Sequence, residues 1–451
     1  MMSERRDRVL ELFDEQKVFM EEKVQAGIEF NRKGIGQITV RDSVGNPIAD
    51  AKISLKQKSH EFKYGANLFM LDELETEEKN ACYKEHMSKF GNMATLPFYW
   101  DATEPEKGKT RYAKDSVPLY RRPPIDLCME FCEKHGIEPR EHALAYEHFF
   151  PKWLYGADTF TIKKALERRY REIAERYGDR IRTIEVTNEM EWTNGRTDFY
   201  TDPDYVEFCF KLAEQYFPCN QLVINEHTAS AWADKCMPTD KYYAYIQSAL
   251  RAGARIDAIG MQFHLFNRRE MEYEKTRHGY NPISLYRHMD LYAQFGKPLQ
   301  VTEVTVPAYS NSDEDEAFQA EAIEKLFSVW FSHPAMEQII YWNMVDGYAH
   351  FWDPDPAKIR ASMGNMALGE NYYYGGLLRF DMTPKPAYYA VKNLFEKKWH
   401  TETLVSTGES GRTCFHGFYG KYDAEIVAGG KTMTLEIDLR KGKKNTFEFT
   451  V

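Results

Sequence analysis

The stretch IEVTNE, from Ile184 to Glu189, decides how this sequence is interpreted. It begins with apolar and β-branched residues, which favour a buried strand, and it ends abruptly on a carboxylate. A second stretch, LQVTE from Leu299 to Glu303, has the same design. If both strands belong to one parallel barrel, their carboxyl ends meet at the same mouth. The sequence therefore predicts that Glu189 and Glu303 form a pair at a shared site.

A pair of carboxyl groups at one site can cleave a glycosidic bond. One group protonates the leaving oxygen, and the other attacks the sugar or activates a water molecule. A single glutamate at the end of a strand is more often a residue that simply turns into solvent. Two glutamates in matched contexts, one of them preceded by Asn188, favour the catalytic interpretation.

Strand-like and helix-like segments alternate from residue 61 to residue 398. This alternation predicts a parallel sheet covered by helices, and eight such strands predict a closed (β/α)8 TIM barrel. An open doubly wound sheet is the rival arrangement, but no glycine-rich phosphate loop follows the first strand. The predicted strands are 61–69, 93–100, 137–146, 181–189, 221–227, 256–264, 297–306 and 336–346, and the helical patterns include 161–177, 204–217, 240–252 and 314–332. We expect the acidic run 311–316 to cap a helix rather than to bind calcium.

The two ends of the chain have a different pattern. Residues 1–33 are expected to form an amphipathic helix, because apolar residues recur at helical spacing among many charges. Residues 34–60 contain two alternating strands around turn residues 45–47, and residues 400–451 are also strand-like. Neither flank is large enough to form a sandwich alone. We therefore expect a barrel over residues 61–399 and a small accessory β-domain built from both flanks.

Composition restricts the class of protein. Of the 451 residues, 28% are charged and 43% are hydrophobic, as in globular proteins. The net charge of −10 argues against nucleic acid or an anionic membrane as a partner, and no apolar run is long enough to span a bilayer. The N-terminal stretch lacks the apolar core of a signal peptide, and the seven cysteines are scattered. A cytoplasmic protein with reduced thiols is therefore expected.

Several segments, in this order along the chain, resemble glycoside hydrolase family 10, the β-1,4-xylanase family. IEVTNE is similar to the segment that carries the family's acid/base glutamate, and LQVTEVTV (299–306) is similar to the segment that carries its nucleophile. Further similar segments are WDATEPEKGKTRY (100–112), EHALAYEHFFPKWL (141–154), IGMQFHL (259–265), IIYWNMVDG (339–347) and LLRFDMTPKPAYYAVKNL (377–394). The resemblance implies a (β/α)8 barrel that hydrolyses β-glycosides with retention and without a metal or cofactor.

The resemblance also implies roles for individual residues. Glu189 would be the acid/base and Glu303 the nucleophile. Asn188 and His264 are candidates to hydrogen-bond Glu303, and Asn188 could also hold the sugar 2-hydroxyl. The histidines lack zinc-binding spacing such as HExxH, so no metal site is expected. The remaining expected substrate contacts are His142, Gln262, Asn225, Trp342, Trp100 and Tyr146.

The sequence departs from the family pattern mainly on the glycone side of the site. The departures are Thr95, Leu96 and Tyr99 in place of polar residues, Tyr146 in place of a Trp, Ile184-Glu185 in place of Trp-Asp, and Thr305 in place of an Asp. Lost polar partners change discrimination more than they change the chemistry. We therefore expect short β-linked oligosaccharides or glycosides, rather than polymeric xylan, as substrates.

Two alternatives remain beside this hydrolase. One is an exo-acting enzyme of the β-glucosidase or β-xylosidase type, and the other is a sugar-binding barrel without activity. Both glutamates and their supporting Asn and His are present, which favours an enzyme. The sequence leaves open the identity of the sugar, endo or exo action, and the oligomeric state.

Overall fold

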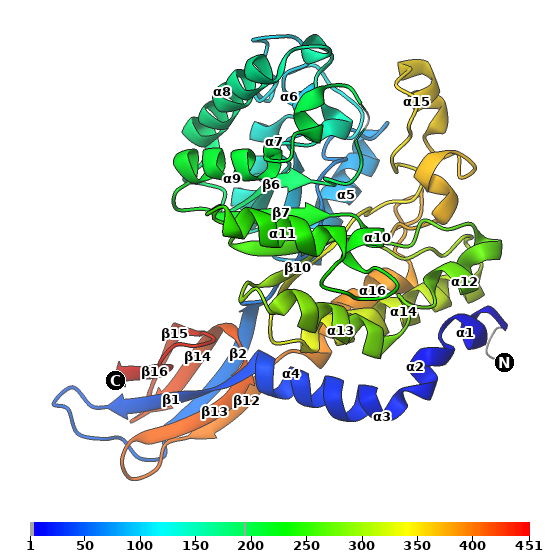
Figure 1. The fold of residues 1–451 in the computed structure, drawn as a ribbon. Coiled ribbons are helices and arrows are strands. Elements are labelled where there is room, and N and C mark those ends of the chain that lie inside the picture. Colours follow the sequence, from blue (N-terminus) through cyan, green and yellow to red (C-terminus); the bar gives the residue numbers. More distant parts are fainter. Residues whose placement is uncertain (1–3, 194) are drawn as a thin grey trace.

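A computed structural model of the chain describes residues 4–193 and 195–451. The larger part is a closed barrel of parallel strands surrounded by helices, and a smaller β-domain extends from one side (Figure 1). This arrangement confirms the predicted fold class. The barrel strands, in hydrogen-bonded order, are β3 (Lys63–Asn67), β4 (Met93–Pro97), β5 (Glu138–His142), β6 (Thr183–Asn188), β7 (Gln221–Glu226), β8 (Ala258–Met261) with its continuation β9 (Phe263–His264), β10 (Leu299–Thr305) and β11 (Met336–Tyr341), which pairs with β3 and closes the ring.

The helices of the barrel form where the sequence patterns predict them. In α8 (Thr159–Tyr177), for example, Asp158 caps the first turn by accepting a hydrogen bond from the amide of Thr161. Ile162 and Leu166 lie on the apolar stripe of this helix and are buried in the main apolar core. The other barrel helices are α5 (Glu77–Phe90), α7 (Ile125–His135), α9 (Tyr205–Tyr216), α11 (Lys241–Arg251), α13 (Pro282–Ala293), α14 (Asp313–Ser332) and α16 (Pro386–Asn393), with the shorter α6 (Trp100–Thr103), α10 (Thr228–Ala231), α12 (Glu272–Thr276) and α15 (Pro356–Ser362). Ser312 caps α14, as the acidic run predicts.

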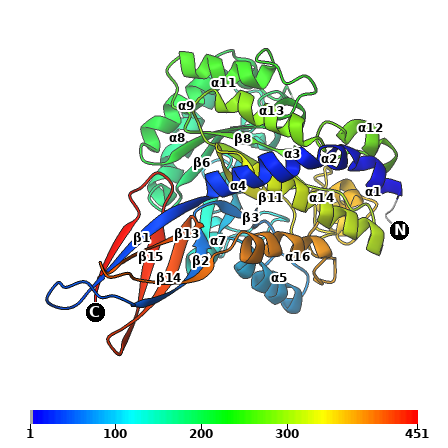
Figure 2. The same cartoon turned by 90° about the horizontal axis from the view of Figure 1, so that it is seen from below.

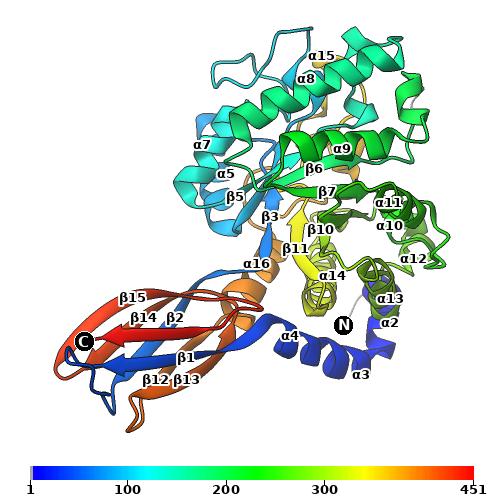
Figure 3. The same cartoon turned by 60° about the vertical axis from the view of Figure 1, so that its left-hand side comes forward.

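The accessory domain is a sandwich of two sheets, and each sheet contains strands from both ends of the chain (Figure 3). Strand β1 (Lys33–Arg41) lies between β13 (Arg412–Phe418) and β16 (Thr446–Thr450). Strand β2 (Lys52–His60) lies between β12 (Glu402–Ser406) and β14 (Gly420–Ala428), and β15 (Lys431–Leu439) follows at the edge. The two strands around the turn at residues 45–47 therefore enter opposite sheets and do not pair with one another. Their buried faces form a separate apolar core that neither flank could enclose alone.

The N-terminal segment differs from the single helix expected over residues 1–33. It is a succession of short helices, α1 (Glu4–Val9), α2 (Glu11–Glu15), α3 (Lys17–Phe19) and α4 (Gln25–Arg32), with a π-helical turn at Met20–Val24. The backbone leaves helical geometry at Leu10 and Gln16. The segment crosses the outer helices of the barrel and leads into β1 (Figure 2). Because each break turns the chain, the segment follows the curved outer surface.

In the part of the chain that the structure describes, no helix combines the length and the apolar character needed to cross a bilayer.

Candidate active site

A cavity of about 520 Å³ opens at the carboxyl ends of the barrel strands, and both predicted glutamates line it. Its other lining residues include Asn188, His142, Gln262, His264, Trp342 and Tyr146 from the predicted set. This is the end of a barrel where catalytic groups are found, because the βα loops converge there. The structure thus brings six of the eight predicted substrate-contacting residues to one cavity with the glutamate pair.

Irregular backbone precedes both glutamates. The pairing of β6 with β7 shifts register between Glu185 and Thr187, and the pairing of β10 with β11 shifts between Val301 and Val304. A shift of this kind re-aims the side chains that follow it. In β10 it lets the consecutive residues Thr302 and Glu303 both reach the barrel interior, where regular alternation would place only one of them.

Glu189 lies directly after β6, with a backbone φ of 49°, in the left-handed region that residues with a β-carbon rarely adopt. Two side chains donate hydrogen bonds to its carboxylate. Tyr146 donates its hydroxyl to Oε2 at 2.5 Å, and Gln262 donates Nε2 to Oε1 at 3.0 Å. Tyr146 therefore positions the acid/base candidate directly, a role that the sequence did not indicate.

Glu303 is buried, with only 3% of its surface exposed. Burial raises the pKa of its carboxyl group to about 8; the proximity of His142 lowers this pKa, whereas the carboxylates of Glu185 and Glu189 raise it further. Nε2 of His264 lies 3.1 Å from Oε2, and Nδ2 of Asn225 donates to Oε1 at 3.2 Å. These two donors favour the ionised form that a nucleophile needs.

A chain of amide groups connects the two glutamates. Oδ1 of Asn188 accepts hydrogen bonds from Gln262, which also contacts Glu189, and from Asn225, which also contacts Glu303. Nδ2 of Asn188 has no hydrogen-bond partner among the described residues, and Asn188 lines the cavity. This free donor is available for a sugar hydroxyl, as the resemblance implies.

Asn225 lies below the cavity and hydrogen-bonds four residues of the site. This corrects the expectation that it contacts sugar. Its side chain is completely buried and does not line the cavity, because Glu185, Asn188 and Glu303 accept from Nδ2 while Thr302 donates to Oδ1 at 2.7 Å. A β-carbon at Gly260 would lie 2.5 Å from Oδ1 of Asn225. Glycine at this position is therefore what leaves room for the Asn225 side chain.

Trp100 is the second residue that the structure places elsewhere. It is buried in the main apolar core, where it packs against Phe150 and Trp153 and donates Nε1 to Glu104 at 3.0 Å. It does not line the cavity, because it begins the short helix α6 and turns away from the barrel mouth. Trp342 does line the cavity and meets the rings of His142 and His264 edge to face.

Beneath Glu303 lies a buried ion pair between Arg140 and Glu185. Burial alone would raise the pKa of Glu185, but His142 and Arg140 outweigh it and lower this pKa. Nδ1 of His142 lies 2.8 Å from Oε1 of Glu185 and 3.9 Å from Oε1 of Glu303. His142, Glu185 and Glu303 are close enough to hold a cation. However, the oxygens of Glu185 already accept from Arg140, His142 and Asn225, which fits a hydrogen-bonded support better than a metal site.

The cavity also contains residues that no sequence motif indicated. Arg121 and Arg122 come from the segment before α7, and Glu370 comes from the long connection between β11 and α16. Trp192 and Trp352 are each 60% exposed at the cavity, which suits stacking against a sugar. None of these residues ends a predicted strand, so the strand-end pattern that located the glutamates gave no signal for them.

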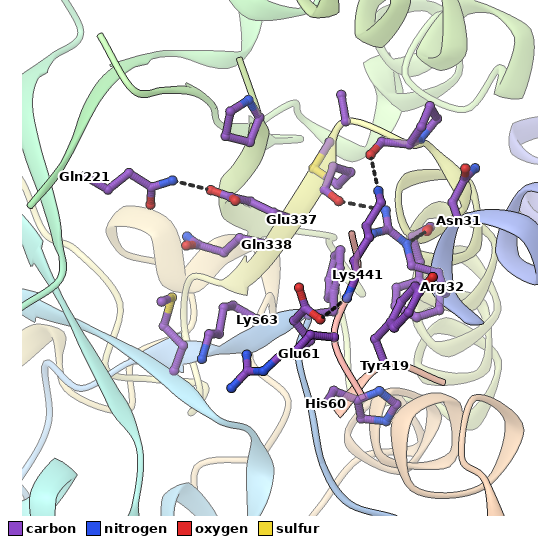
Figure 4. Close-up of a pocket in the computed structure, with 18 of the residues that line it drawn as sticks. Asn31, Arg32, His60, Glu61, Lys63, Gln221, Glu337, Gln338, Tyr419 and Lys441 are labelled. Carbon is purple, nitrogen blue, oxygen red and sulfur yellow. Dashed lines mark hydrogen bonds between the residues drawn. The ribbon is translucent and has the colours of Figure 1, made fainter. Parts of the chain in front are cut away.

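A larger cavity of about 760 Å³ lies at the opposite, amino-terminal end of the barrel strands, near the accessory domain (Figure 4). Arg32 donates there to the carbonyl groups of His333 and Met336, and Gln221 donates to Glu337 at 2.7 Å. In (β/α)8 barrels the amino-terminal end of the strands usually contributes to stability, whereas catalytic groups lie at the opposite end. We assign the chemistry to the smaller cavity, because only that cavity contains the paired glutamates.

Comparison with known proteins identifies, along most of the barrel, the family that the sequence motifs resemble. The model of "Glycosyl hydrolase family 10" matches residues 56–394. Anti-sigma-I factor RsgI6 of Acetivibrio thermocellus is 24% identical over 426 residues, which cover 92% of this chain and 48% of that protein. Endo-1,4-beta-xylanase B of Thermotoga neapolitana is 24% identical over 66% of this chain and 78% of its own length. The chain thus spans about half of the first relative.

Solved structures share the fold. Native xylanase 10B from Thermotoga maritima superposes with a TM-score of 0.56 at 23% identity, over 75% of this chain and 96% of that one. Xylanase 10B from Thermotoga petrophila, solved with xylobiose, gives a TM-score of 0.57 at 22% identity, over 75% of this chain and 95% of that one. The family match covers well over half of the 451 residues and includes both glutamates. This chain belongs to glycosyl hydrolase family 10.

Proposed function

We propose that the protein hydrolyses β-glycosidic bonds with retention of configuration. The observation that carries this proposal is the convergence of Glu189 and Glu303, from β6 and β10, on one cavity and one hydrogen-bond chain. In the first step Glu189 protonates the leaving oxygen while Glu303 attacks the anomeric carbon and forms a glycosyl ester. In the second step Glu189 takes a proton from a water molecule whose oxygen attacks the anomeric carbon. The ester bond to Glu303 breaks, the sugar leaves with the new hydroxyl group, and Glu303 is again a carboxylate while Glu189 is again protonated.

The surroundings of the two glutamates support different roles. Glu189 accepts hydrogen bonds from Tyr146 and Gln262 at the edge of the cavity, where a leaving group can reach it. Glu303 is more deeply buried, with His264 and Asn225 as donors. Asn188 keeps a free donor for the sugar 2-hydroxyl, a contact that strengthens in the transition state.

The proposed substrates are short β-linked oligosaccharides or glycosides rather than polymeric xylan. Relatives named endo-1,4-beta-xylanase support the general class. The polar glycone contacts of that class are replaced here, however. Thr95 and Leu96 are completely buried and do not line the cavity. Each lost hydrogen bond to a sugar hydroxyl removes about 1 kcal/mol of transition-state binding.

A substrate screen tests this proposal. Aryl β-glycosides, xylo- and gluco-oligosaccharides and soluble xylan are compared by kcat/KM, with Glu303→Gln as the inactive control. Hydrolysis of short substrates that exceeds hydrolysis of xylan, with the β-anomer as the first product by NMR, is expected. An α-anomer appearing first contradicts retention. Failure to hydrolyse any β-glycoside leaves the sugar-binding barrel as the better description.

A further inference from the structure

Two consecutive arginines, Arg121 and Arg122, line the same cavity as the glutamate pair. Only 3% of Arg121 and 9% of Arg122 is exposed. A buried guanidinium is unfavourable unless an opposite charge accompanies it. Within residues 4–193 and 195–451, neither arginine forms an ion pair with a carboxylate; their hydrogen bonds go to neutral groups.

Neither guanidinium has all of its N–H donors paired with acceptors of the described residues. Nη1 of Arg121 donates to Oδ1 of Asn343 at 2.9 Å and to the carbonyl of Tyr348 at 2.6 Å, but its buried Nε has no hydrogen-bond partner. Arg122 donates only Nη1, to the carbonyl of Arg121 at 2.8 Å, among the described residues. Its guanidinium carbon lies 3.9 Å from the centre of the Tyr99 ring. Nη2 of Arg121 and Nη2 of Arg122 donate to no described residue and, unlike Nε of Arg121, are not among the fully buried atoms. Because both side chains line the cavity, these two Nη2 groups are the donors that a bound molecule could use.

The arginines lie close to the reaction centre on the glycone side. The ring of Tyr99 separates Arg122 from His142, because the Tyr99 hydroxyl lies 2.9 Å from Nε2 of His142. His142 in turn lies 3.9 Å from Glu303. Tyr99 follows β4, the strand whose usual polar contacts to the sugar are absent. The arginine pair thus occupies the side of the cavity where the neutral polar contacts are missing.

The nearby ionisable groups do not cancel this positive charge by direct contact. Asn343 separates Glu370 from Arg121, and burial raises the pKa of Glu370. Burial also raises the pKa of Asp101 to about 6. Burial and the neighbouring arginines lower the pKa values of His148 and His350, which are therefore neutral at pH 7. They can serve as hydrogen-bonding groups for sugar hydroxyls.

We propose that the glycone side of this cavity binds an anionic sugar, a hexuronic acid unit whose carboxylate accepts hydrogen bonds from Arg121 and Arg122. This inference rests on the proposed function, because β-glycoside cleavage defines which side holds the glycone. Guanidinium groups present parallel N–H donors that match a planar carboxylate, and such charge-assisted bonds exceed neutral ones in strength. A neutral pentose or hexose would leave both buried charges without a partner.

Equilibrium binding to the Glu303→Gln variant tests recognition separately from catalysis. Titration calorimetry compares β-linked disaccharides whose non-reducing unit is glucuronic acid, glucose, glucose 6-phosphate or glucose 6-sulfate. The glucuronic acid ligand is expected to bind at least about tenfold more tightly than the glucose ligand, as one charge-assisted hydrogen bond provides. Equal affinities overturn the proposal. Tighter binding of the phosphate or sulfate ester overturns the assignment of a carboxylate.

Substitutions in the same background separate charge from packing. Arg122→Gln is expected to reduce the ratio of acidic to neutral affinity at least about tenfold, and Arg122→Lys is expected to restore part of it. Arg171→Gln removes an exposed arginine of α8, remote from the cavity, and serves as the matched control. A ratio that is unchanged in Arg122→Gln, or reduced equally in Arg171→Gln, contradicts the assignment.

Kinetics on the unsubstituted protein distinguish the two proposals. Aryl glycosides of the acidic and neutral disaccharides are compared by kcat/KM. Hydrolysis without preference for the acidic substrate, together with equal binding, rejects the anionic subsite and leaves the glycosidase intact. Preferential binding of the acidic ligand without hydrolysis of any substrate upholds the subsite and rejects the glycosidase.

Discussion

The hydroxyl group of Thr305 lies 2.9 Å from Nδ1 of His264. The other imidazole nitrogen, Nε2, faces Oε2 of Glu303 at 3.1 Å. Burial lowers the pKa of His264 to about 4, so the ring is neutral at pH 7. A neutral ring that accepts from Thr305 at Nδ1 carries its proton on Nε2 and donates it to Glu303. Thr305 therefore fixes the His264 tautomer that donates to Glu303, the proposed nucleophile, without supplying a charge.

Thr305→Asp should move the acid limb of the pH–activity profile to lower pH. A carboxylate beside Nδ1 raises the pKa of His264 and favours the imidazolium ion. That positive charge then lowers the pKa of Glu303, which is raised to about 8 by burial. Because the nucleophile must be ionised, kcat/KM should persist to a pH about one unit lower. Thr305→Asn is the uncharged control, and an equal shift in both variants contradicts this account.

Glu189→Ala should slow the hydrolysis of substrates with poor leaving groups by roughly 10²–10⁴-fold, the usual contribution of general acid catalysis. Aryl glycosides with acidic phenols need little protonation, so their glycosylation step should lose less. Steady-state and burst kinetics on a series of aryl β-glycosides measure this difference. Equal losses across the series are incompatible with a role as acid.

Glu303→Gln should stabilise the fold in a pH-dependent way. Burial raises the folded-state pKa of Glu303 to about 8 from an ordinary value of 4.5. Between these values the folded state holds a proton that the unfolded state has released, so stability falls as pH rises through this window. Each pKa unit corresponds to about 1.4 kcal/mol. The Tm advantage of Glu303→Gln should therefore be small at pH 4.5 and largest at pH 8.

Thermal unfolding across this pH range checks the stability prediction, with Glu409→Gln as a control for the loss of one exposed carboxylate. A Tm advantage of the same size at pH 4.5 and pH 8 would show that the Glu303 carboxyl is not perturbed by burial.

Labelling by a mechanism-based fluoroglycoside tests the catalytic identity of Glu303. Modification of any other carboxylate rejects the nucleophile assignment.

Gly260→Ala should reduce activity through Asn225. The added β-carbon would lie 2.5 Å from Oδ1 of Asn225 and 2.9 Å from Thr302, so a shift at Asn225 is expected to disturb its hydrogen bond to Glu303. Loss of this donor disfavours the ionised nucleophile, and kcat should fall at least about tenfold at pH 7. Gly253→Ala, at a position with no atom within 4 Å of a β-carbon but a φ of 85°, controls for the cost of replacing a glycine. An unchanged kcat in Gly260→Ala would show that Asn225 does not support the nucleophile.

Asn225 and Trp100 show where the resemblance to the family misplaced residues. Trp100 begins one of the segments that resemble the family, and Asn225 lies near the end of a predicted strand (221–227). Asn225 is nevertheless enclosed by Glu185, Asn188 and Thr302, and Trp100 turns into the core with Phe150. Whether a side chain meets sugar or another side chain depends on neighbours from other strands, which no single segment contains.

The sequence by itself determined the barrel and its glutamate pair. Strand periodicity is local, and the position of a carboxylate that follows a buried strand, such as Glu189 after β6 (Thr183–Asn188), is set by that strand. Only the tertiary structure decided the electrostatics of the site. The Arg140–Glu185 ion pair and the contact of Tyr146 with Glu189 join segments tens of residues apart, and the fold places Arg121 and Arg122 at the cavity that holds both glutamates. Their charges interact strongly because the barrel buries them together, and burial is a property of the packed fold rather than of any one segment.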